Sequence, residues 1–219
     1  MKKIIAFILA ALMMLTLVAC TSDANDDTTN DTAVDTDAIV DSNEDAAASD
    51  ASIADVAQAL ANKYAEYTGM RQSYDEYMAE ASEEDQISFE EFCSYQLYVA
   101  PIEDGSEGLM GFNEAPAGYS EAYIYQPMMM GQAFIGYVFR VAEGTDVEAF
   151  KKTLTETSDV RWNICTAANT TVCENYGDIV YFSMMVVADE ENPFGFTAEQ
   201  KDGFYNAFLE AVKTSSDAE

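Results

Sequence analysis

The chain has 219 residues, with 10 basic and 40 acidic side chains and no histidine, so its formal net charge at pH 7 is −30. An acidic surface without a basic stripe cannot neutralise phosphates, which excludes nucleic acid as a partner. The absence of histidine excludes Ser-His-Asp and Cys-His nucleophile pairs, and zinc or iron sites with histidine ligands.

The N-terminal stretch predicts a bacterial lipoprotein signal peptide over residues 1–19. Lys2 and Lys3 precede an apolar run, and Leu17-Val18-Ala19 leads directly into Cys20. We expect diacylglycerol transfer to the Cys20 thiol and cleavage before it. An uncleaved membrane anchor is one alternative, but the run of about 15 residues is shorter than the roughly 20 that a spanning helix needs. A plain secretory signal is the second alternative, and a cysteine at this position argues against it.

Residues 20–51 predict an acidic, disordered tether. The stretch is rich in Asp, Thr, Asn, Ser and Ala, and after Cys20 it contains no aromatic residue, lysine or arginine. Like charges keep such a segment extended, so we expect it to hold the following domain away from the membrane. Weak calcium binding by the Asp-rich run is the functional alternative.

Residues 52–219 have the length of one domain, and their first helix is predicted from Ile53 to Thr68, with Gly69 as its stop. A short helix follows Ser73, and another is predicted from Phe89 to Tyr98. Two later helices begin at capping boxes, in which a Ser or Thr side chain and a Glu or Gln three residues later satisfy free amides. These boxes are Thr145-Asp-Val-Glu148 and Thr197-Ala-Glu-Gln200.

The strands are expected in the second half of the domain. Residues 133–141 and 179–187 are nearly continuous apolar runs, which is typical of central strands covered on both faces. Residues 161–168 and 170–175 are shorter and more mixed, with Tyr176-Gly177-Asp178 as a turn. The pattern predicts an α+β fold with a mostly antiparallel sheet of about four strands and helices packed on it.

Several short motifs carry a resemblance to a known group. These are Pro127-Met128 before an apolar strand, a capped acidic helix, Arg161-Trp162-Asn163-Ile164-Cys165, and Gly177-Asp178 before a hydrophobic strand. Together with the signal peptide, residues 125–187 resemble a group of small uncharacterised lipoproteins of Gram-positive anaerobic bacteria. The resemblance implies an extracytoplasmic, membrane-anchored α+β domain and carries no assigned activity.

The cysteines predict one disulfide. With Cys20 lipidated, Cys93, Cys165 and Cys173 remain on the oxidising side of the membrane. If residues 168–170 form a hairpin loop, Cys165 and Cys173 face each other across two strands at a distance that a disulfide can span. Free thiols in an anaerobic cell are the alternative.

A weak calcium site is a second hypothesis, for the stretch from Glu80 to Glu91. Its end resembles the closing half of an EF-hand loop, so that Glu80, Ser82, Glu84 and Glu91 are the candidate ligands. Position six holds Asp85 where glycine permits the turn. The same letters also describe a capping box at Ser88, which is the competing interpretation.

An aromatic and sulfur-rich stretch is the candidate binding surface. Its side chains belong to residue types that make adaptable contacts in pockets and interfaces, namely Tyr119, Tyr123, Tyr125, Met128, Met129 and Met130. The competing interpretation is that they pack an edge strand and its turn.

The function predicted from these features is a lipid-anchored, extracytoplasmic binding or interaction module without catalytic residues or a cofactor. Its expected partners are the membrane, through the lipid on Cys20, and a protein, peptide or glycan ligand. The alternative is a carboxylate-based enzyme acting on cell-envelope glycans, because two carboxylates suffice for glycoside hydrolysis. A purely structural envelope component is the third possibility. The glycines of residues 105–111 are flanked by acids, which argues against a phosphate-binding loop.

Overall fold

Antiparallel strands form one five-stranded sheet in the computed structural model, which describes residues 49–93, 96–103, 109–114, 116–128, 133–163 and 166–214. The strands lie in the order β1-β2-β3-β5-β4, with bounds Leu97–Pro101 (β1), Tyr119–Pro127 (β2), Phe134–Val141 (β3), Thr170–Tyr176 (β4) and Ile179–Met185 (β5). All neighbouring strands are antiparallel. The α+β class is confirmed, and the sheet has five strands where about four were expected.

The two long apolar runs form interior strands of the sheet, as predicted. β3 and β5 pair with each other from Phe134↔Met185 to Arg140↔Ile179. Every residue of β5 is buried, and in β3 only Arg140 is partly exposed. Strands covered on both faces need apolar residues at every position rather than at alternate ones, which explains their sequence.

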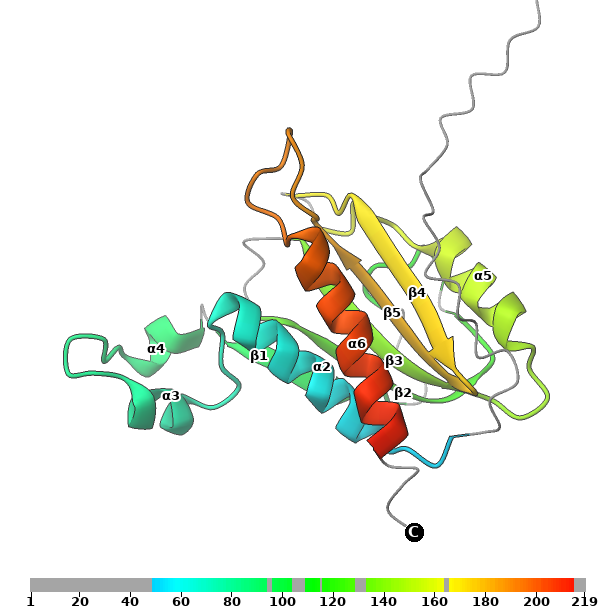
Figure 1. The fold of residues 1–219 in the computed structure, drawn as a ribbon, viewed down its shortest axis with the longest axis horizontal. Coiled ribbons are helices and arrows are strands. Elements are labelled where there is room, and N and C mark those ends of the chain that lie inside the picture. The colour runs from blue at the N-terminus through cyan, green and yellow to red at the C-terminus, as the bar shows by residue number, and fades with distance from the viewer. Residues whose placement is uncertain are drawn as a thin grey trace, which may run out of the picture. The chain divides into compact units, whose positions relative to one another are not determined.

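Helices cover both faces of this sheet. Their bounds are Ile53–Thr68 (α2), Tyr74–Glu80 (α3), Phe89–Phe92 (α4), Val147–Thr157 (α5) and Ala198–Thr214 (α6). α2 and α6 lie together on one face (Figure 1), where residues such as Leu60 and Phe208 join one core cluster. α5 contributes Phe150 and Leu154 to a second cluster on the other face.

The predicted helix caps are present, with one shift. The Ser52, Ser73 and Ser88 side chains accept hydrogen bonds from the backbone amides three residues later, and Gly69 ends α2 with φ 74°. Thr197 and Gln200 satisfy each other's amides reciprocally, as a capping box requires. At α5 the cap is Asp146 and not Thr145, because its carboxylate accepts from the Ala149 amide at 2.6 Å. A carboxylate at a helix start is also favoured by the helix dipole.

The helix predicted from Phe89 to Tyr98 is wrong in its second half. α4 ends at Phe92, and Leu97 begins β1. The Leu97 amide donates to the Arg71 carbonyl at 2.8 Å, and the strand pairs with β2. Pairing with a distant strand decided this segment, which local periodicity does not reveal.

The strand predicted over residues 161–168 is also wrong, because none of its described residues is in a strand. Asp159 starts a turn there: its side chain accepts from the Arg161 amide at 2.9 Å and its carbonyl from the Trp162 amide at 3.0 Å. Such local capture by an Asp side chain competes with strand pairing. The sheet instead contains β1 and β2, which were not among the predicted strands.

The packed domain begins slightly before Ser52. Ser49 and Ala51 are buried, with 6% and 0% of their surfaces exposed, while Asp50 between them is exposed. The predicted signal peptide and the tether up to residue 48 lie outside the described residues.

Candidate functional site

The tyrosines of the predicted binding surface do not lie on one surface. Tyr125 is fully buried beneath the helices, and Tyr123 packs at the margin of the same core cluster. Tyr119 packs on the other face, 5.3 Å from Phe139 between ring centroids. The prediction that these three side chains form one surface is therefore wrong.

A β-bulge explains this division. Tyr119 pairs with Val141 and Glu121 with Arg140, so β2 has one extra residue at Ser120. An extra residue reverses the alternation of side chains along a strand. Tyr119 consequently shares a face with Ala122 instead of Tyr123.

Met128 is the part of the predicted surface that is exposed, with 51% of its surface accessible. Tyr98 on β1 is 42% exposed and lies opposite Gln126, so it is diagonal to Met128 across the strand pair. Tyr98 was not predicted as a surface residue because its segment was assigned to a helix. Met129 and Met130 lie outside the described residues.

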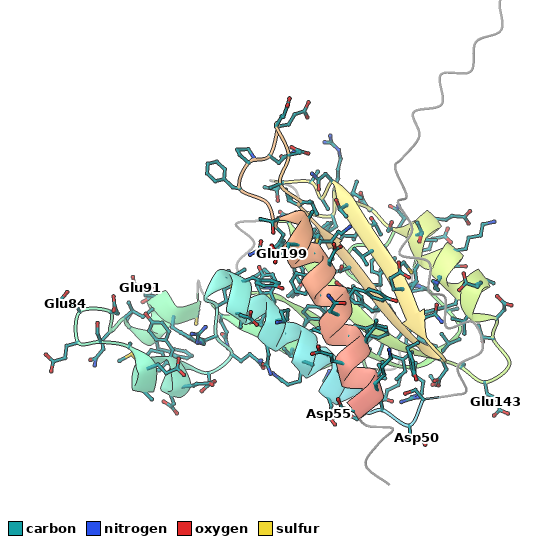
Figure 2. All side chains as sticks on the ribbon, in the orientation of Figure 1. Asp50, Asp55, Glu84, Glu91, Glu143 and Glu199 are labelled. Atoms are coloured by element: carbon teal, nitrogen blue, oxygen red, sulfur yellow. The ribbon has the colours of Figure 1, made fainter. Side chains whose placement is uncertain are left out.

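The calcium candidates do not converge on a site. Glu80 ends α3 beside Arg71, at 3.5 Å, and Ser82 donates to Asp85 at 2.5 Å. Glu84 lies in the following loop and Glu91 on α4 (Figure 2). Within the described ranges, no group of three His, Cys, Asp or Glu side chains is arranged to hold a metal ion. The capping interpretation accounts for the sequence, since the Ser88 hydroxyl accepts from the Glu91 amide.

Cys173 is a free thiol, so the predicted disulfide is not formed by it. The expected hairpin is also absent: the Asn169 amide donates to the Met185 carbonyl, and β4 pairs with β5. Cys165 lies outside the described residues. Burial raises the pKa of the Cys173 thiol to about 12, although nearby Lys151 opposes this shift. Cys173 is therefore a poor nucleophile at neutral pH.

Three hydroxyl groups are buried between the sheet and the helices. The Tyr181 and Ser183 hydroxyls share a hydrogen bond of 2.8 Å, and the fully buried Tyr125 lies over Gly136, which is paired with both Tyr125 and Ser183. Desolvation raises the pKa of Tyr181 to about 12 and that of Tyr125 well above its ordinary value. These tyrosines stay protonated and are enclosed by core side chains, so they form a structural polar cluster.

Glu174 on β4 is a candidate general acid, because its pKa is raised above the ordinary value of a glutamate. Partial desolvation raises its pKa, Lys151 opposes the shift and Glu148 adds to it. Glu174 on the edge strand β4 and Glu148 on α5 are nevertheless both exposed, and Glu148 forms an ion pair with Lys151 at 2.9 Å. Glycoside hydrolysis needs two carboxyl groups that flank a bound sugar, and these two side chains stand in solvent instead.

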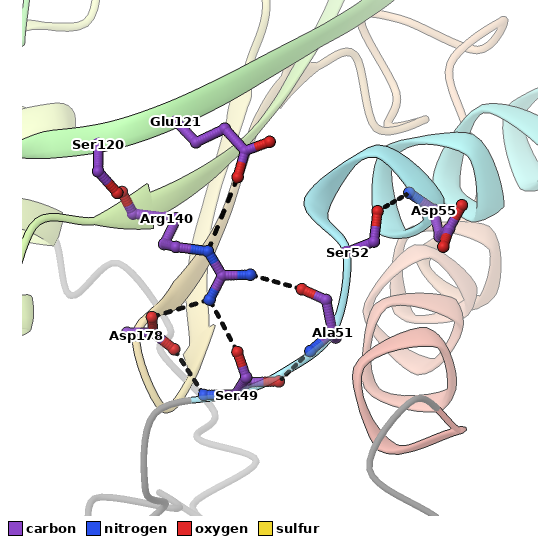
Figure 3. Close-up of polar contacts among 8 residues, drawn as sticks. All are labelled: Ser49, Ala51, Ser52, Asp55, Ser120, Glu121, Arg140 and Asp178. Atoms are coloured by element: carbon purple, nitrogen blue, oxygen red, sulfur yellow. Dashed lines mark hydrogen bonds and ion pairs between the residues drawn. The ribbon is translucent and has the colours of Figure 1, made fainter. Parts of the chain in front are cut away.

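A polar network of side-chain and backbone groups surrounds Arg140, at the end of β3 (Figure 3). Its Nη1 donates to Asp178 Oδ2 at 2.9 Å and to the Ser49 carbonyl at 2.8 Å, and its Nη2 donates to the Ala51 carbonyl. Asp178 Oδ1 accepts from the Ser49 amide at 2.7 Å. We call the Arg140 and Asp178 side chains with the backbone of residues 49–51 the Arg140 network. It joins the first packed residues of the domain to its interior strands.

Comparisons with family models, curated proteins and solved structures find no match to this chain. The described part of the chain contains no helix with the length and apolar character that a membrane span requires.

Sequence reasoning missed the Arg140 network, although one signal for it is present. Arg140 is the one charged residue in the apolar run 133–141, and Asp178 stands in the turn before the second such run. A charge at the end of a buried strand needs a partner, and Asp178 in the turn supplies it. The backbone partners at Ser49 and Ala51 have no sequence signature.

Proposed function

We propose that this chain is a lipid-anchored extracytoplasmic protein whose α+β domain is a non-catalytic binding or interaction module. One observation carries the proposal: two lysines, an apolar run and Leu17-Val18-Ala19 precede Cys20 in the order of a lipoprotein signal. A lipoprotein cysteine carries at least two acyl chains, which are enough for stable membrane attachment. The resemblance to small lipoproteins of Gram-positive anaerobes supports the same assignment.

The chemistry of the domain supports binding over catalysis. The chain has no histidine, and desolvation keeps the Cys173 thiol and the Tyr125 and Tyr181 hydroxyls protonated. The half-exposed Tyr98 and Met128 supply adaptable apolar contacts at one edge of the sheet. The labelled acids in Figure 2 come from several separate elements, so negative charge covers the domain broadly instead of marking one site.

The attachment is tested by Cys20→Ser in a Gram-positive host, with metabolic labelling by an alkyne analogue of palmitate and separation of membranes from culture fluid. We expect the wild type to be labelled and membrane-bound. The Cys20→Ser variant should be unlabelled and should appear in the culture fluid. Cys93→Ser is the matched control, since it removes a different cysteine, and it should behave as the wild type.

Two outcomes contradict this assignment. If Cys20→Ser stays in the membrane fraction, the N-terminal run is an uncleaved anchor. If the wild type is unlabelled and found in the culture fluid, the run is a plain secretory signal.

The binding function is tested with the immobilised Cys20→Ser chain and solubilised cell envelope. We expect retention of a discrete envelope component and no change in its mass after elution. Fragmentation of envelope glycans by the same chain would favour the enzymatic alternative instead.

A further inference from the structure

We propose that the Arg140 network receives any pull on the N-terminal segment and passes it to β3 and the β4–β5 turn, so that the start of α2 is not the first element to be loaded. The inference rests on the proposed function in one respect, because a sustained pull arises only if the chain is held at Cys20. We call the hydrogen bonds from Arg140 and Asp178 to the backbone of residues 49–51 the grip, and the grip is a property of the domain alone.

The network holds the main chain and not the side chains of the segment. The Ser49 amide donates to Asp178 and the Ser49 carbonyl accepts from Arg140, so both backbone groups of one residue are bound. The Ala51 carbonyl accepts from the second guanidinium nitrogen. Ser49 and Ala51 are buried at the points of contact. The segment cannot slide through such a grip without breaking all three hydrogen bonds together.

The two charged residues are attached to the interior of the sheet. Arg140 pairs with Ile179 of β5 and with Glu121 of β2. The Asp178 carbonyl accepts from the Val141 amide at 2.8 Å, so the turn is tied to the end of β3 by its backbone as well as by the ion pair. Force that reaches the guanidinium enters β3, and force that reaches the carboxylate enters the turn that leads into β5; both of these strands have neighbours on both sides.

α2 is the element that this arrangement spares. Ser52 caps the helix directly after the grip, and Ile53, with 1% of its surface exposed, is its first residue. Without the grip, tension would act on this cap and unwind the helix from its end. Each residue then lengthens from about 1.5 Å to about 3.5 Å, so a helix yields one turn at a time, and Ile53 and Val56 leave the core early.

The test is single-molecule pulling on the full chain carrying Cys20→Ser, with handles at its two ends. Arg140→Met keeps the length of the side chain and removes every donor. We expect the force of the first unfolding event to fall to about half of the wild-type value or less. Glu121→Gln is the matched control, because its carboxylate lies 3.8 Å from Arg140 Nε, beyond hydrogen-bond distance, and it should keep the wild-type force.

A second pulling direction separates a grip from general stabilisation. With one handle at Glu84, in the exposed loop between α3 and α4, and the other at the C-terminal end, the load bypasses residues 49–51. Arg140→Met should then unfold at nearly the wild-type force. An equal loss of force in both directions would show that Arg140 only stabilises the core, and an unchanged end-to-end force would show that it carries no load. Either result overturns the proposal.

Arg140→Lys covers the case in which the methionine variant does not fold. A lysine keeps the charge but has one nitrogen in place of the planar fork, so it reaches fewer of the acceptors. We expect an end-to-end force between those of the wild type and Arg140→Met, and a force equal to the wild type would contradict the proposal. Because the chain in these experiments carries no lipid, their outcome is independent of whether Cys20 is acylated in cells.

Discussion

Gly136→Ala tests the packing on which the buried sheet depends. Gly136 lies in β3, directly opposite Tyr125 of β2. A methyl group at position 136 would overlap the Tyr125 ring and lie 2.6 Å from its hydroxyl oxygen. The ring is fully buried and packs 5.5 Å from Phe134 between centroids, so it cannot swing aside into solvent.

The expected cost follows from this overlap. Overpacking a core typically costs about 1–3 kcal/mol, and overlap with ring atoms that cannot move places this case near 3 kcal/mol. The lower backbone entropy of alanine offsets about 0.5–1 kcal/mol of that cost. At about 2–4 °C per kcal/mol for a domain of this size, we expect the melting temperature to fall by about 4–10 °C.

Thermal and urea unfolding, followed by circular dichroism, measure the change. Tyr125→Leu in the same chain removes the ring, so the double variant should be more stable than the sum of the two single effects. Gly203→Ala on α6 is the control, because its methyl group meets chiefly the hydroxyl end of the partly exposed Tyr67, which can move. Alanine also favours a helix by up to about 1 kcal/mol over glycine, so this variant should be nearly neutral.

The reasoning is refuted if Gly136→Ala melts within about 2 °C of the wild type, which corresponds to less than about 1 kcal/mol. Strict additivity with Tyr125→Leu would refute it as well, because it would mean that the two residues do not compete for the same space.

Two further predictions concern titratable groups. Burial raises the pKa of Cys173 to about 12, so its alkylation by iodoacetamide at pH 8 should be about three orders of magnitude slower in the folded chain than in the urea-unfolded chain. Mass spectrometry of the Cys173 peptide measures both rates. Similar rates would contradict the desolvation of this thiol. The Asp189 pKa is lowered, chiefly by the Asn192 amide, with the Asn192 and Asn169 side chains adding to the effect. A group whose pKa is lower in the folded state stabilises the fold above its unfolded pKa, and this contribution is lost as the pH falls below about 4. Asp189→Asn should therefore lose less stability than the wild type between pH 6 and pH 2.5 in urea unfolding, and equal losses would show that the Asp189 carboxylate does not contribute to stability.

Helix boundaries were predicted well where a side chain acts on its own neighbours. The Ser52, Ser73 and Ser88 caps, the Gly69 stop and the Thr197 capping box each satisfy amides within a few residues. Such interactions need no tertiary partner, so they can be predicted from the sequence. At α5 the residue type alone does not identify the cap, because Thr145 and Asp146 are both good capping residues and the structure uses Asp146.

Segments whose structure depends on a distant partner were predicted poorly. Residues 97–98 joined a strand because β2 offers them hydrogen bonds, and residues 161–163 became a turn around Asp159. The tyrosines of β2 were separated by one bulge at Ser120, which moved Tyr119 to the other face. A single-residue change of register reverses every side chain beyond it, so a surface predicted from adjacent letters was wrong.

The sequence by itself determined the acidic character of this protein, the α+β class and the two buried strands, and it is also the source of the proposed lipid attachment at Cys20. Each of these depends on composition or on residues that are close together in the chain, so no distant partner is needed to predict it. Only the tertiary structure decided which residues meet: Tyr125 over Gly136, and Arg140 and Asp178 around the backbone of Ser49. These contacts join positions up to 129 residues apart. Their partners include main-chain atoms that every residue possesses, so no pattern of side chains predicts them.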